Sequence, residues 1–114
     1  MRTLLIACGN PLRGDDGVAH EVLRSLEPAP DRELLSVQQL TPEIAAELAR
    51  FERVVFLDAD VSATTITIEP VSEALSSSPL SHWSSPAEIV ALARGLYRFR
   101  GEALVCRITA RMFG

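Results

Sequence analysis

The sequence predicts an α/β fold in three layers, in which a mainly parallel sheet of about five strands lies between helices. Short apolar runs alternate along the chain with segments of helical periodicity, which is the pattern of strands joined by crossover helices. Residues 53–57 are apolar almost throughout, as expected of a strand covered on both faces. The length of 114 residues suffices for one modest core, so we expect a single domain over residues 1–114.

The first half of the chain has the pattern of strand, helix, strand and helix. Residues 1–8 are a mostly apolar run, and apolar side chains then recur at helical spacing until Pro28 stops them. Glu33–Val37 is a short second strand. Thr41-Pro42-Glu43 has the residue types of an N-cap, a first position and an early acid of a helix. The buried face of this helix is expected to carry Ile44, Ala45, Leu48 and Phe51.

The second half continues the alternation. The apolar run 53–57 is expected to be the central strand, and the β-branched alternation of residues 64–68 predicts a strand nearer the edge of the sheet. Residues 72–85 are rich in Ser and Pro and predict a loop. Residues 103–108 form the last strand. A helix that begins at Pro86 is expected to turn inward Ile89, Val90, Leu92, Ala93 and Leu96.

The composition excludes several classes of partner. The formal net charge is −4 and the basic residues are scattered, so no basic patch for nucleic acid or an anionic membrane is expected. No apolar run approaches the roughly 20 residues of a membrane-spanning helix. Cys8 and Cys106 lie inside apolar runs, which suits free thiols in a reducing compartment better than a disulfide. We therefore expect a soluble cytoplasmic protein.

Two carboxylates follow the first predicted strand in the glycine-rich loop of residues 9–17. Asp15 has the position of an N-cap or first-turn acid, which stabilises the start of a helix. Asp16, directly after it, exceeds what capping requires and is a candidate functional residue. A nucleotide-binding loop is the competing interpretation. The glycine spacing fits neither the dinucleotide fingerprint nor the P-loop, no lysine follows, and two carboxylates repel phosphate.

Further candidates follow the central strand and the serine-rich segment. Asp58 comes directly after the apolar run, where its side chain is expected to face the crevice at the carboxyl end of the strand. Asp60 suits a turn instead. Of the two histidines, His20 falls within the first predicted helix and is typical of a surface residue, whereas His82 lies in a loop just before a helix start.

Asp16, Asp58 and His82 come from three separate strand-to-helix connections, so we expect them to converge at one edge of the parallel sheet. Two carboxylate oxygens and one imidazole nitrogen suit a borderline divalent ion such as nickel, zinc or cobalt, with open positions for substrate or water. An aspartic-type dyad, in which two acids share a proton, is the alternative. The residues alone leave both interpretations open.

Three segments of the chain resemble the [NiFe]-hydrogenase maturation endopeptidases. They are Leu5–Gly17, Leu57–Ala59 and His82–Glu88, and they occur in the order expected of that family across almost the whole chain. The resemblance implies a phosphorylase/hydrolase-like fold, with a mixed five-stranded sheet between helices. It also implies an endopeptidase that removes the C-terminal extension of a hydrogenase large-subunit precursor after nickel has been inserted.

The same resemblance implies roles for the three candidate residues. Family members contact nickel in the substrate through an acid after the Gly-Asn loop, an aspartate after the central strand and a loop histidine, which correspond here to Asp16, Asp58 and His82. We therefore expect these residues to be both catalytic and metal-contacting. The implied metal is nickel carried by the precursor, which other divalent ions can replace, and the implied partner is the precursor itself.

The chain departs from the family pattern in two places. Gln38–Pro42 stands where many relatives have an acidic, glycine-rich stretch, and the chain stops at Gly114, where relatives continue into a final helix. We therefore expect a truncated form without its C-terminal helix, and self-association through the apolar sheet face that this helix would cover. The alternative function is a metal-binding or precursor-binding module that does not cut, which a cleavage assay separates from a peptidase.

Overall fold

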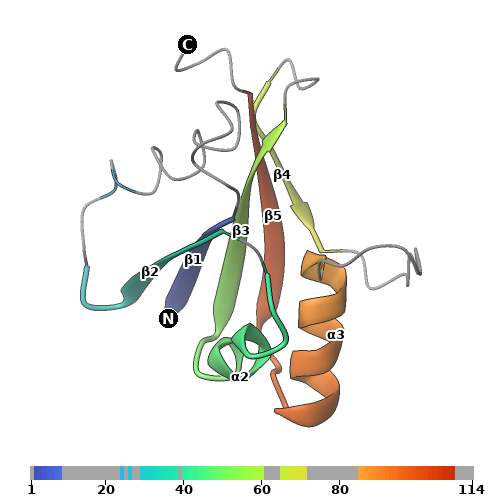
Figure 1. Cartoon of the computed structure of the whole chain (residues 1–114). Helices are drawn as coiled ribbons and strands as arrows, with labels where there is room; N and C mark the ends of the chain where they lie inside the picture. The colour runs from blue at the N-terminus through green and yellow to red at the C-terminus, as the bar shows by residue number, and fades with distance from the viewer. Residues whose placement is uncertain are drawn as a thin grey trace.

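The computed structural model describes residues 2–8, 24, 26, 29–38, 40–60, 65–71 and 85–109. Within these ranges it contains five strands and two helices, in the order β1 (Thr3–Cys8), β2 (Arg32–Val37), α2 (Ile44–Leu48), β3 (Arg53–Asp60), β4 (Thr67–Pro70), α3 (Pro86–Leu96) and β5 (Glu102–Thr109). All five strands belong to one sheet (Figure 1). The predicted α/β fold with a five-stranded sheet is confirmed.

The strands are ordered β2-β1-β3-β5-β4 across the sheet. β1 pairs in parallel with both β2 and β3, and β3 pairs in parallel with β5. Only the pairing of β4 with β5 is antiparallel among the described strands, and β4 lies at an edge of the sheet. The four parallel strands therefore end together at one edge, here called the carboxyl edge, and begin together at the opposite amino edge.

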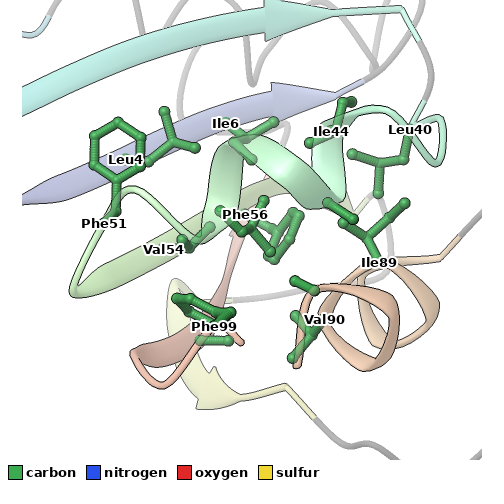
Figure 2. Packing of buried hydrophobic residues seen from close by; sticks show 14 residues of the cluster. Leu4, Ile6, Leu40, Ile44, Phe51, Val54, Phe56, Ile89, Val90 and Phe99 are labelled. Atoms are coloured by element: carbon green, nitrogen blue, oxygen red, sulfur yellow. The ribbon is translucent and has the colours of Figure 1, made fainter. Parts of the chain in front are cut away.

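The main core lies between one face of the sheet and the two helices. Because side chains alternate along a strand, every second residue of β1, β3 and β5 points toward this layer. Figure 2 shows the labelled side chains meeting there, from strands, helices and the turns that connect them. Full burial of one such aliphatic side chain stabilises the fold by about 1.5–3 kcal/mol. The most deeply buried members include Ile6, Leu48, Val54, Phe56, Ile89 and Val90.

The opposite face of the sheet carries a second, smaller cluster. Ala7, Leu57 and Ile108 are buried in it, and Leu5, Leu34, Val55 and Cys106 are partly buried around them. This cluster uses the alternate residues of the same strands that build the main core, as a two-residue repeat requires. The helix predicted after the first strand lies outside the described residues, apart from Arg24 and Leu26.

The start of α3 follows from its sequence. Ser85 has extended backbone angles, and its hydroxyl accepts a hydrogen bond from the backbone N–H of Glu88 at 3.2 Å. Pro86 occupies the first turn, where its missing N–H costs nothing. These features confirm the predicted helix start at Pro86. The prediction that Leu96 points inward is wrong, because its side chain is 69% exposed in the last turn of the helix.

Two predicted element boundaries are also corrected. α2 begins at Ile44 with Glu43 as its N-cap, so Thr41 is not the cap. The Thr41 side chain instead hydrogen-bonds to Glu43 and, together with a hydrogen bond from the Glu43 backbone, lowers the pKa of that carboxyl. The strand expected at residues 64–68 is β4, displaced to Thr67–Pro70 because its bounds are set by pairing with β5. No helix in the described ranges is long and apolar enough to cross a membrane.

Candidate active site at the carboxyl edge of the sheet

The strand order creates a topological switch point between the carboxyl ends of β1 and β3, where a ligand crevice is expected. From β1 the chain moves outward to β2 and then returns past β1 to β3, so the connections that follow β1 and β3 leave in opposite directions. In open α/β sheets ligands bind at such a switch point. The two strands that flank it are adjacent and parallel, with Ala7 level with Leu57. Chemistry is therefore expected at the residues that directly follow these two positions.

β3 supplies Asp58 to this edge. Val54 and Phe56 are buried in the main core, and Asp58 continues their side of the strand, where the core gives way to solvent. Its side chain is exposed. β3 continues to Asp60, three residues past the predicted end at Leu57, because Asp60 pairs with Thr109 of β5. Asp58 is thus held on a rigid strand instead of in the turn that follows it.

A row of charged residues crosses three strands beside Asp58. Asp58 is level with Arg107 on β5, and Arg107 is in turn level with Thr67 on β4. Arg107 Nη1 lies 2.8 Å from Glu69 Oε2, in an ion pair between two partly exposed side chains. The row therefore places a positive charge next to the strand position of Asp58. Arg107 and Glu69 were not predicted from the sequence to lie near the site. A charged residue inside each of two short strands is the signal that could have identified them.

The structure positions one of the three predicted site residues. Asp58 lies at the carboxyl edge, as predicted, whereas Asp16 and His82 lie outside the described residues, as do Asp15 and His20. β1 and β3, the described strands that precede Asp16 and Asp58, are adjacent and parallel. The convergence of all three residues stays a prediction.

The expectation that parallel strands precede all three site residues is wrong for His82. β4, the last described strand before His82, runs antiparallel to β5. β4 therefore leads toward the amino edge, where the Val71 N–H donates to Ala103 O at 2.9 Å. Ala103 is four residues before Arg107, or about 13 Å along β5. Residues 72–84 can span up to about 43 Å, so their length permits a return to the carboxyl edge.

The described residues alone do not form a metal site. Among them, no group of three or more His, Cys, Asp or Glu side chains could hold a metal ion. Cys106 lies on β5 as a free cysteine, and burial raises the pKa of its thiol because a low-dielectric environment penalises the thiolate. The other two residues of the predicted ligand set, Asp16 and His82, lie outside the described ranges.

Three solved structures share this arrangement of strands and helices. The hydrogenase maturating endopeptidase HybD from E. coli is 21% identical, with a TM-score of 0.62 over 96% of this chain and 74% of its own. The [NiFe] hydrogenase maturation protease HycI from Thermococcus kodakarensis is 19% identical, with a TM-score of 0.67 over 95% and 73% of the two chains. A hydrogenase 2 maturation peptidase from a Thaumarchaeota archaeon is 17% identical, with a TM-score of 0.57 over 94% and 78%.

The chain has the fold of these hydrogenase maturation proteases. The resemblance inferred from the sequence is thereby confirmed for the fold. No protein-family model and no curated protein matches the sequence. Within the hydrogenase maturation protease fold, the β1/β3 crevice with Asp58 on its rim is the position at which the topology favours a ligand site.

Proposed function

We propose that this protein is an endopeptidase that removes the C-terminal extension of a [NiFe]-hydrogenase large-subunit precursor after nickel insertion. The observation that carries the proposal is the fold, which three hydrogenase maturation proteases share over 94–96% of this chain. The exposed Asp58 carboxylate at the β1/β3 crevice adds a functional group at the expected position. The partner is the precursor, and the protein acts in the cytoplasm.

The proposed site consists of Asp16, Asp58 and His82, which contact the nickel that the precursor carries. The metal belongs to the substrate, so contact with it restricts cleavage to a precursor into which nickel has been inserted. Two carboxylate oxygens and one imidazole nitrogen suit nickel or a similar borderline ion, and they leave coordination positions for ligands from the precursor. Asp58 lies on β3, and the segment that contains Asp16 follows the neighbouring parallel strand β1, which supports the proposal that both acids act at the same edge of the sheet.

Metal titration tests this ligand set. The wild-type protein should bind nickel or zinc added in solution, and His82→Ala should weaken binding by at least about tenfold, because a lost ligand of this kind removes much of the affinity of a three-residue site. His20→Ala is the matched control, since His20 has no assigned role and should leave the affinity unchanged. Equal affinities for the wild type and the His82 variant would remove His82 from the site.

A precursor-binding module that does not cut is the other function open to this fold. Both functions require contact with the precursor, so binding alone does not distinguish them. Shortening of the precursor distinguishes the two functions, because a binding module would leave the precursor at full length. Asp58→Asn separates them further, since loss of cleavage with retained precursor binding is expected only of a peptidase.

A further inference from the structure

The turn between α3 and β5, residues 97–101, presents two arginines at the amino edge. Arg98 has a φ of 58°, in the left-handed region that L residues other than Asn and Asp rarely adopt. Phe99 follows it and is buried, and its N–H donates to Ala93 O at 3.0 Å, which ties the turn to the end of α3. The buried Phe99 anchors the turn, while Arg98 and Arg100 on either side of it are exposed.

These two arginines differ from the others near them. Within the part of the chain that the structure describes, neither Arg98 nor Arg100 makes a hydrogen bond, an ion pair or a ring contact. The neighbouring arginines all have partners. Arg2 and Arg50 lie over the Phe51 ring. Arg94 lies over the Phe99 ring, and Arg53 forms an ion pair with Glu102. Two guanidinium groups are thus exposed and available, one of them on an unfavourable backbone conformation.

Both groups line the same shallow pocket, together with Phe51 and Gly101. Two acidic residues also line it, but both are engaged. Glu102 Oε1 accepts a hydrogen bond from Arg53 Nε at 2.8 Å, and Glu52 Oε1 accepts one from the backbone N–H of Arg2 at 3.2 Å. The two arginines and two glutamates that line the pocket balance in formal charge. Because Arg53, which does not line the pocket, neutralises Glu102, one positive charge is in excess there, on a protein whose net charge is −4.

We propose that this pocket binds a carboxylate group from an acidic peptide segment of a protein partner. Guanidinium groups bind carboxylates through paired, charge-assisted hydrogen bonds, and two such groups are free here. A single carboxylate matches the one excess positive charge, whereas a doubly charged phosphate exceeds it. Asp58 is five residues along β3 from Arg53, or about 16 Å away, so this site is separate from the proposed peptidase site.

The test uses the full chain with a synthetic hexaglutamate peptide and, separately, inorganic phosphate, each titrated calorimetrically at low salt. The wild type should bind the peptide more tightly than phosphate. The double variant Arg98→Gln with Arg100→Gln should bind the peptide at least about tenfold more weakly, because it loses both charge-assisted contacts. An unchanged affinity of the double variant would overturn the proposal, and tighter binding of phosphate than of peptide would overturn the carboxylate assignment.

Two further variants test whether a loss of peptide binding comes from this pocket, and not from a general change in charge or from misfolding. Arg107→Gln removes the same charge at the carboxyl edge and should change peptide affinity by less than about twofold. If Arg107→Gln weakened peptide binding as much as the double variant does, the pocket would not be the site. Arg98→Gly supplies the residue that prefers a φ of 58°, so its Tm should be equal or higher while peptide binding weakens. Full affinity in this variant would exclude Arg98.

Discussion

Asp58 is the described residue on which the proposed chemistry depends. It lies where an apolar strand reaches solvent, so its carboxylate contributes little to the core. Asp58→Asn should therefore abolish processing of nickel-loaded precursor while leaving Tm unchanged, because an amide keeps the shape but lacks the negative charge and the ligand strength of a carboxylate. Precursor length by mass spectrometry and thermal melting by circular dichroism are the measurements.

The control for this variant is Asp31→Asn. Asp31 is also an exposed aspartate, but it precedes β2 at the amino edge, far from the crevice. Its replacement should leave processing intact. Full processing by the Asp58 variant, or equal loss in both variants, would show that Asp58 has no specific role.

Cys106 provides a pH-dependent prediction. Burial raises the pKa of its thiol, so at a given alkaline pH the folded protein has less thiolate than the unfolded chain. In a Cys8→Ser background, the pH profile of iodoacetamide labelling should lie at higher pH for the folded protein than for the urea-unfolded protein. Because the folded pKa is the higher one, the linked stability is present below the unfolded pKa and is lost as the pH rises through the folded pKa. Coincident labelling profiles would contradict the assigned burial.

The site could be predicted from the sequence only in part. Asp58 was found because it ends an apolar run, which is a local signal. Arg107 is a neighbour of Asp58, and Glu69 is the ion-pair partner of Arg107, through the register of three strands, which no local pattern contains. The direction of the strand that precedes His82 could not be predicted locally either. The direction of β4 depends on its pairing with β5 and not on its own residues.

At the level of elements, replacing each of two glycines with alanine is expected to change the free energy of unfolding in opposite directions. Gly95 lies in α3, and a Cβ there would meet no atom within 4 Å, so Gly95→Ala should raise the free energy of unfolding by about 0.5–1 kcal/mol. Gly101 begins the entry to β5, and a Cβ there would overlap the Glu52 carbonyl oxygen and lie 2.6 Å from Phe99 Cε1. Gly101→Ala should lower the free energy of unfolding by about 1–3 kcal/mol.

Urea denaturation of the two variants measures both effects. They are matched, because each adds one methyl group to a glycine within the same α3–β5 unit. A stabilising Gly101→Ala would mean that the close approach of the turn to β3 is not as the structure describes it. A strongly destabilising Gly95→Ala would mean that this part of α3 is packed against another segment.

The strands were easier to predict than their ends. β1, β3 and β5 follow from continuous apolar runs, because they lie in the interior of the sheet and face the apolar clusters on both sides. β4 was displaced by three residues at its start, because an exposed edge strand has no buried face to mark its position. α2 was predicted from its apolar spacing, whereas its start depends on the turn at residues 41–43.

At the scale of the whole molecule, the alternation of elements predicted a mainly parallel sheet, and the comparisons confirm that fold. The order β2-β1-β3-β5-β4 could not be predicted, since several orders bury the same apolar residues. That order is nevertheless what places Asp58 beside the carboxyl end of β1. Self-association stays a prediction, which sedimentation at low and high concentration can examine.

The central claim is that this chain cuts a hydrogenase precursor only after nickel insertion. The most direct measurement is incubation of the purified protein with nickel-loaded and nickel-free large-subunit precursor, followed by mass spectrometry of the products. The account predicts that the nickel-loaded precursor loses its C-terminal extension and that the nickel-free precursor keeps it. Full-length precursor in both reactions, with the protein folded and bound to it, would contradict the peptidase assignment and favour a binding module.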